Sequence, residues 1–190
     1  MREDQIIRGC LKGKYDCQRA LYDLHRVSMF MLCIRYMPTR EDAEDVLQEG
    51  FIKIYRDLHQ YNPERGTLHA WMRRVMLNTA LQHLRAKKHL ISPLEIENFA
   101  DLHPVNDDVF SDMTAKELTA LIQQLPTGYR VVFNMYVVEG YSHQEIAGEL
   151  EISINTSKSQ LFKAKAMLRK QVKQIFATAD AEYENTELQR

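Results

Sequence analysis

Aromatic, cationic and amide side chains recur at helical spacing between residues 67 and 88. At about 100° per residue they share one arc of a helix, and apolar side chains lie beside that arc. Such a face suits single-stranded nucleic acid, because unstacked bases need a flat ring and phosphates need cations. We weigh equally the alternative that Trp71, the only tryptophan, is a core residue. The face comprises Trp71, Arg74, Asn78 and Arg85.

A second group lies on a long helix predicted to begin between residues 153 and 156 and to run past Ile175. A basic helix of this kind fits the major groove of duplex DNA, where Lys and Arg meet guanine acceptors or phosphates. The alternative is that Phe162 completes the core and the lysines are solvated. The side expected to pack comprises Leu161, Ala164, Leu168 and Ile175. The adjacent arc comprises Lys158, Phe162, Lys165 and Arg169.

The net charge of −1 hides a strong segregation of charge along the chain. Residues 61–91 hold six basic side chains against one acidic side chain. Residues 92–127 hold one against seven, and residues 152–179 hold six against none. Two basic segments separated by an acidic one predict two contacts with a polyanion, joined by a segment that makes none. For either segment alone, a solvated helix face is the alternative.

Low glycine and proline content, 7 and 5 in 190 residues, together with helical periodicity, predicts an all-α protein. An N-terminal domain is expected over residues 1–91. Its first predicted helix covers residues 15–37, and a second begins after a capping box at Thr39. A loop follows at residues 59–66, and the capping residue Thr67 then opens a third helix. On the first helix, the apolar residues that recur at helical spacing are Leu21, Leu24, Val27, Met31 and Ile34. The outer face of the second is expected to carry Glu41, Asp42, Glu44, Asp45 and Glu49.

The second half of the chain contains a predicted helix-turn-helix. One helix ends at Pro126, and the next is expected to run from Thr127 to Val138, with Gly140 as its C-cap. A capping box at Ser142 then opens a short helix, and a tight turn leads to the long basic helix. The predicted layout is a flexible acidic linker at 92–112, a C-terminal domain at 113–178 and an acidic tail at 179–190.

Several classes of protein are disfavoured by the composition. The longest apolar run, six residues from Met29 to Ile34, is far shorter than the ~20 residues of a membrane span. The chain begins without the apolar run of a secretory signal, so we expect a cytoplasmic protein. No C-x-x-C pair, Gly-rich phosphate loop or catalytic carboxylate pair is present, so we expect no enzyme activity, cofactor or metal. Buried thiols are the interpretation of Cys10, Cys17 and Cys33.

Four motifs occur in a characteristic order. They read DAEDVLQEGF at 42–51, WMRRVMLN at 71–78, LP followed by YSHQEIA between 125 and 147, and TSKSQLFKAK at 156–165. This combination closely resembles the bacterial RNA polymerase sigma factors of the extracytoplasmic-function (ECF) type, in the sigma-70 family. The resemblance covers nearly the whole chain, about residues 20–172, and is far more specific than a lone helix-turn-helix.

In that family, an N-terminal helical domain binds the polymerase clamp and melts the minus-ten element. A C-terminal domain reads the minus-thirty-five element as duplex. The resemblance implies core-polymerase binding by Asp45, Gln48 and Glu49, with Phe51 expected in the core. It implies capture of a flipped base by the loop Tyr61–Gly66, and minus-ten contacts by Tyr61, Asn62, Arg65, Trp71, Arg74, Asn78 and Arg85. The implied minus-thirty-five contacts are Thr156, Lys158, Ser159, Phe162, Lys163, Lys165 and Arg169.

The recognition motif departs from the family pattern. Ser157 stands where Val is usual and Gln160 where Arg is usual, and two further Arg positions hold Lys163 and Lys165. Bidentate guanine readout should therefore be weaker than in the family, because Lys lacks the forked guanidinium.

The predicted function is that of a sigma factor in transcription initiation. Its expected partners are core RNA polymerase, promoter DNA as duplex and as single-stranded non-template strand, and an anti-sigma factor, without membrane insertion. One alternative is a conventional helix-turn-helix regulator with an N-terminal sensing or dimerisation domain. Another is an interaction protein whose N-terminal domain only docks to a partner.

Overall fold

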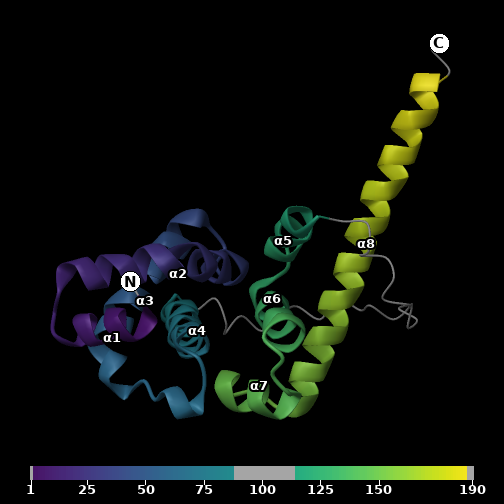
Figure 1. Cartoon of the computed structure of the whole chain (residues 1–190). Helices are drawn as coiled ribbons and strands as arrows, with labels where there is room; N and C mark the ends of the chain where they lie inside the picture. Colours follow the sequence, from purple (N-terminus) through teal and green to yellow (C-terminus); the bar gives the residue numbers. More distant parts are fainter. Residues whose placement is uncertain (1, 88–113, 188–190) are drawn as a thin grey trace. The chain divides into compact units, whose positions relative to one another are not determined.

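The computed structural model describes residues 2–87 and 114–187, which are helical and form no strand (Figure 1). They fall into two compact units, the N-terminal unit (2–87) and the C-terminal unit (114–187). The all-α fold with two helical domains is confirmed. The predicted linker at 92–112 and the last residues of the predicted tail, 188–190, lie outside the described residues.

The N-terminal unit begins with a helix that the sequence did not predict. This helix, α1, carries charged or amide side chains at four of its nine positions and buries only Ile6, Gly9 and Cys10. Gly9 is required for its packing on α2, since a Cβ there would lie 2.1 Å from the Cys17 sulfur. The elements of this unit are α1 (Glu3–Leu11), α2 (Tyr15–Tyr36), α3 (Arg40–Asp57), the 3₁₀ turns η1 (Leu58–Gln60) and η2 (Pro63–Arg65), and α4 (Leu68–Ala86).

Helix α2 contacts both α3 and α4, but not through the whole of the predicted apolar face. Leu21 of that face is fully buried, whereas Leu24, Val27 and Met31 are 65%, 69% and 42% exposed. Apolar side chains recur at helical spacing on two sides of α2, so periodicity alone placed the helix correctly and its packing face only in part. The side chains of α2 that form the core are Cys17, Leu21, Met29, Leu32, Cys33 and Tyr36.

Thr39 caps α3 as predicted, since its hydroxyl oxygen accepts a hydrogen bond from the Asp42 backbone N–H at 3.1 Å. Asp42, however, does not belong to the exposed acidic face. Its carboxylate is buried, where it accepts hydrogen bonds from the Thr39 hydroxyl at 2.9 Å and from Lys87, and lies 3.4 Å from His83 Nε2. The Lys87 hydrogen bond lowers the pKa of Asp42. This cluster joins the first turn of α3 to the end of α4.

The three cysteines are buried and form no disulfide, which confirms their interpretation as buried thiols. Burial raises the pKa of Cys10 to about 11 and that of Cys33 to about 12. Both groups therefore stay in the thiol form at neutral pH, and the thiol is a poor nucleophile.

The C-terminal unit contains a wider turn within the second predicted helix. The predicted helix at 127–138 consists of α6 and a π-helical turn, in which Glu139 N–H bonds to the Asn134 carbonyl. Buried Asn134 also donates its side-chain amide to the Arg130 carbonyl at 3.0 Å, where the turn widens. Gly140 follows with φ +77°, as its predicted capping role requires. The elements are α5 (Ala115–Gln123), α6 (Thr127–Phe133), the π turn η4 (Asn134–Val138), α7 (His143–Leu150) and α8 (Ile154–Glu187).

Helices α7 and α8 form the predicted helix-turn-helix. The Ser142 capping box is present, and Glu151 turns the chain with φ +56°. Ser153 then caps α8, since its hydroxyl accepts from the Thr156 N–H at 2.9 Å. The core side of α8 is formed by Ser157, Leu161, Ala164, Leu168 and Val172.

Ile175 does not pack, contrary to the prediction, and is 46% exposed. Figure 1 shows that α8 continues beyond α5, α6 and α7. Over the residues the structure describes, every helix is too short or too polar to cross a lipid bilayer.

Candidate nucleic-acid interface

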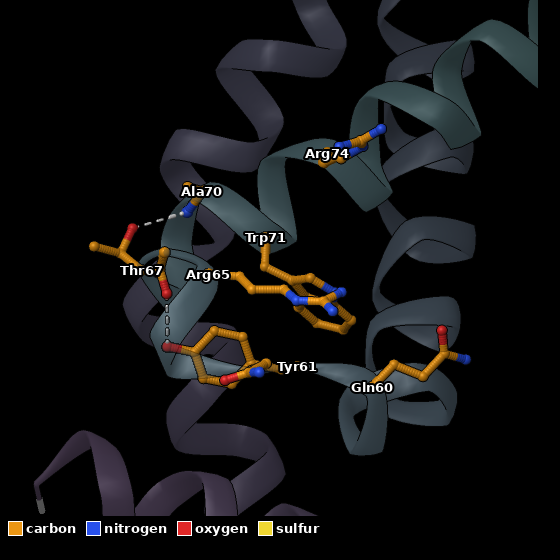
Figure 2. Close-up of a pocket in the computed structure, with 9 residues that line it drawn as sticks. Gln60, Tyr61, Arg65, Thr67, Ala70, Trp71 and Arg74 are labelled. Carbon is orange, nitrogen blue, oxygen red and sulfur yellow. Dashed lines mark hydrogen bonds between the residues drawn. The ribbon is translucent and has the colours of Figure 1, made fainter.

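An open cavity of about 440 Å³ lies where the turn η2 meets the start of α4 (Figure 2). The rings of Tyr61 and Trp71 have centroids 6.0 Å apart on its wall, and the side chains of Arg65 and Arg74 line it too. Trp71 is half-buried and lines this cavity, so it is not among the fully buried core side chains. The cavity is lined by Gln60, Tyr61, Asn62, Arg65, Gly66, Thr67, Ala70, Trp71 and Arg74.

Local hydrogen bonds hold the cavity loop in shape. The Tyr61 hydroxyl donates to the Gly66 carbonyl at 3.2 Å, across the loop. Gly66 adopts φ +143°, a conformation that favours glycine. Thr67 caps α4 as predicted, by accepting from the Ala70 N–H at 3.2 Å. The loop therefore presents a preformed hollow rather than an extended strand of backbone.

The remaining predicted minus-ten residues lie further along α4. Asn78 is exposed and Arg85 is half-buried, and neither lines the cavity. The structure thus divides the predicted face into a cavity and a helical track beyond it. Gln60 and Ala70 line the cavity but were not predicted, although each directly precedes a predicted residue, Tyr61 and Trp71.

The outer face of α3 carries the predicted polymerase-binding residues. Asp45, Gln48 and Glu49 are all exposed, and Glu49 pairs with Lys53 at 2.7 Å. Ile52 lies on the same arc and is 65% exposed, which the sequence analysis missed. The sequence could have indicated Ile52, because this residue lies seven positions after Asp45 and therefore on the same face of the helix. Phe51 is buried, as expected.

The recognition helix α8 presents a convex face. Phe162 is 46% exposed, so the alternative in which it completes the core is wrong. Lys158 and Ser159 are exposed, whereas the remaining predicted contacts are half-buried along the edges of the face: Thr156, Lys163, Lys165 and Arg169. Asn155 is also exposed on this face and was not predicted. The Thr156 hydroxyl lies 2.8 Å from that of Ser153, so it is already part of the helix cap.

The departure at Ser157 has a structural explanation. Ser157 is fully buried, and its hydroxyl lies 2.9 Å from His143 Nδ1 at the start of α7. The His143 ring stacks on Tyr136, with centroids 4.5 Å apart. Burial, followed by the nearby charge of Lys158, lowers the pKa of His143. A hydrogen bond between the two helices thus stands where a valine would make an apolar contact.

The cavity and the exposed face of α8 are the two candidate nucleic-acid contacts. Among the residues the structure describes, no cluster of three or more His, Cys, Asp or Glu side chains is arranged to hold a metal ion. The hollow with its rings and cations suits an unstacked base, and the protruding basic helix suits a groove.

Comparisons with known proteins agree with this division. Residues 21–90 match the family model for Sigma-70 region 2, and residues 115–168 match that for Sigma-70 region 4. Together the two matches span more than half of the chain. The chain therefore belongs to the sigma-70 family of bacterial RNA polymerase sigma factors.

Individual curated sigma factors are similar to most of the chain. The RNA polymerase sigma-H factor of Pseudomonas aeruginosa is 27% identical over 189 residues, covering 94% of this chain and 97% of the relative. The ECF sigma factor SigW of Bacillus subtilis is 27% identical over 180 residues, covering 89% and 96%. The ECF sigma-E factor of Escherichia coli is 26% identical over 186 residues, covering 92% and 96%. The chain is thus similar to sigma factors of the ECF type.

A solved structure supports the fold. The sigma factor RpoE of Bartonella quintana, crystallised with the anti-sigma factor NepR, matches with a TM-score of 0.51 at 17% identity. The match covers 82% of this chain and 96% of that chain.

Proposed function

We propose that this sigma factor initiates transcription by dividing promoter recognition between its two units. The N-terminal domain, residues 1–91, binds core polymerase and opens the minus-ten element. The C-terminal domain, residues 113–178, reads the minus-thirty-five element as duplex, and residues 92–112 connect the two. The mechanism is binding and strand separation without covalent chemistry. The protein acts in the cytoplasm, where polymerase binds the chromosome.

The observation that carries the proposal is the cavity beside Trp71. A base that leaves the duplex loses its stacking, and the Tyr61 and Trp71 rings offer an aromatic surface in exchange. Arg65 and Arg74 line the same hollow, where they neutralise the phosphates that flank the base. Asn78 and Arg85 then contact the non-template strand along α4. Capture of the strand stabilises the open state, and this is how binding energy drives melting.

Core polymerase binds the outer face of α3 in this proposal. Asp45, Gln48 and Glu49 supply polar and acidic groups to a basic partner, and Ile52 supplies an apolar contact among them. An interface of this kind has an apolar centre and a polar rim.

The C-terminal unit places α8 in the major groove. Lys158, Ser159 and Phe162 are the exposed side chains closest to base edges in this arrangement, whereas Lys163 and the half-buried cations at the edges contact phosphates. An anti-sigma factor is the proposed regulator, supported by the relative from Bartonella quintana that was crystallised with one.

Transcription with core polymerase tests the function as a whole. Purified protein added to core enzyme should start transcripts from a cognate promoter, selected from a library of promoter sequences. Under the conventional-regulator alternative, the chain by itself would bind duplex DNA tightly and core enzyme would gain no promoter specificity.

A charge reversal tests the polymerase contact. The double variant Asp45→Lys, Glu49→Lys should lose affinity for core enzyme while keeping its helical circular dichroism, because both side chains are exposed. Glu64→Lys, an exposed acid outside α3, is the control and should bind normally. Unchanged affinity of the double variant would place the contact elsewhere.

A further inference from the structure

Helix α2 carries apolar side chains that the other helices of the N-terminal unit leave uncovered. Leu24, Val27 and Met31 are 65%, 69% and 42% exposed. Together with half-buried Ala20, they fall within about 60° of one another around the helix axis. Helix α1 packs against α2 without covering them. A contiguous row of exposed apolar side chains, unlike a single one, marks an interaction surface. We call this row, Ala20, Leu24, Val27 and Met31, the α2 stripe.

The side chains of the α2 stripe match a second copy of the same helix in size. In an antiparallel pair related by a two-fold axis, the residues of one helix face those of the other in reverse order. An axis that crosses between residues 25 and 26 places Met31 of one copy opposite Ala20 of the other. The same axis places Leu24 opposite Val27. The longest side chain of the stripe thus meets the smallest, and such pairing lets two helices approach closely.

The charged edge of the α2 stripe is also complementary to itself. The Asp23 carboxylate lies between Arg19 and Arg26, 3.8 Å from the Nε of each. All three side chains are more than half exposed, so these ion pairs contribute little to the stability of the single chain. In the antiparallel pair the same edges meet, and Asp23 of one copy lies within one helical turn of Arg26 of the other. By symmetry, two such pairs form.

We propose that the α2 stripe joins two copies of this chain through an antiparallel pair of α2 helices. The alternation of Arg, Asp and Arg along the edge favours a second copy over a partner whose edge carries a single sign of charge. One helix pair is smaller than the ~800 Å² per partner of a standard interface, so we expect a weak dimer, with a dissociation constant of about 10–100 μM. The inference does not depend on the proposed function, because it involves neither the cavity nor the outer face of α3.

Sedimentation velocity of the full chain tests the dimer, at concentrations from well below to well above that dissociation constant. The sedimentation coefficient should rise with concentration from the monomer value toward the dimer value. Val27→Glu should remove the rise, because it would bury two carboxylates in an apolar contact. Val137→Glu is the matched control, since it changes an exposed valine of the C-terminal unit, and it should dimerise normally.

Two results of this experiment would overturn the proposal. One is a sedimentation coefficient that stays at the monomer value throughout the concentration range. The other is a Val27→Glu variant that dimerises as tightly as the wild type, with circular dichroism showing that it is folded. In that case the two copies would meet through a different surface.

An exchange of charges tests the antiparallel orientation. Asp23→Arg and Arg26→Asp should each weaken self-association about tenfold, because like charges then face one another across the pair. An equimolar mixture of the two variants should associate as tightly as the wild type, since the reversed charges are again opposite in the mixed dimer. A mixture that associates no more tightly than either variant alone would contradict the antiparallel pairing.

Binding to core polymerase separates this surface from the proposed function. Below the dissociation constant of the dimer, Val27→Glu should bind core enzyme as tightly as the wild type. Weaker core binding by Val27→Glu, with normal binding by Val137→Glu, would assign the α2 stripe to polymerase and overturn the proposal. The double variant Asp45→Lys, Glu49→Lys should show the reverse pattern, with normal self-association and weakened binding to core enzyme.

Discussion

The candidate nucleic-acid contacts of the two units have opposite shapes. The N-terminal unit has a hollow lined by two aromatic rings and two arginines, held by a short loop against α4. The C-terminal unit has a protruding helix, α8, with Lys158 and Phe162 exposed on it. A hollow receives a base only after it has left the duplex, whereas a protruding helix fits the groove of an intact duplex. The difference in shape therefore predicts that the C-terminal unit binds the duplex before melting, and that the N-terminal unit binds its base only once the duplex has melted.

The largest expected effect concerns the hollow. Trp71→Ala should reduce promoter opening by about 10- to 100-fold, because one stacked base is worth about 1–3 kcal/mol. Potassium permanganate footprinting on a duplex promoter measures the opening. A pre-melted bubble should restore transcription, and Trp71→Phe should retain most of the opening. Loss of transcription on both templates would show that Trp71 supports the fold instead. The proposed difference between a base-binding hollow and a groove-binding helix would then be contradicted.

A smaller effect is expected on the protruding helix. Phe162→Ala and Lys158→Ala should each relax the preference at particular minus-thirty-five base pairs, by roughly tenfold for a true base contact. Lys163→Ala should weaken all sequences alike, because its proposed contact is a phosphate. Binding of holoenzyme to a panel of minus-thirty-five variants measures both. A uniform loss for all three variants would leave α8 without base readout.

The Asp42 cluster should affect the stability of the N-terminal unit alone. Asp42→Asn should lower its unfolding free energy at pH 7 by about 1 kcal/mol, since a charge-assisted hydrogen bond from Lys87 is weakened. Trp71, the only tryptophan, reports the unfolding of this unit through its fluorescence.

The pH dependence of this effect follows from the lowered pKa of Asp42. The stabilisation is present above the ordinary value of 3.8 and is lost as pH falls through the lower pKa of the folded state. The difference between wild type and Asp42→Asn should therefore shrink over that acidic range. A constant difference would show that the carboxylate charge is not what stabilises the cluster.

The smallest expected effect concerns the turn of the helix-turn-helix. Glu151 has φ +56°, which costs a residue with a Cβ more than it costs glycine. Glu151→Gly should therefore raise the stability of the C-terminal unit by about 0.5–1 kcal/mol. Thermal unfolding followed by circular dichroism measures the change. Glu149→Gly, inside α7, is the comparison and should destabilise instead, because glycine lowers helix propensity.

Local patterns in the sequence were sufficient to predict the helices that begin with a capping side chain. Thr39, Thr67 and Ser142 cap the helices predicted for them, because a capping hydrogen bond involves residues only two or three positions apart. The helix α1 was not predicted; it spans only nine residues, so its apolar pattern repeats over fewer than three turns. The motifs were equally local and sufficient for the sigma-70 family, whose region 2 and region 4 models match the chain.

Which face of a helix is covered was decided only by the tertiary structure. Leu24, Val27 and Met31 repeat as regularly as core residues and yet are exposed, while the charged Asp42 is buried beside Lys87. Periodicity reports that a helix has an apolar face, but burial depends on which other helix reaches that face. Ile175 shows the same limit, since it was expected on the packing side of α8 and is 46% exposed.

The candidate site was likewise predicted in its residue types and not in its shape. The sequence by itself determined that Tyr61, Arg65 and Trp71 would lie near one another, because a short loop leads directly into α4. It did not determine that they line a hollow, that Asn78 and Arg85 lie outside it, or that Gln60 belongs to it. Those facts depend on how the loop folds back against α4, through contacts such as Tyr61 with Gly66 and with Trp71. A pattern of residue types carries no information on a volume, which exists only once the chain has closed around it.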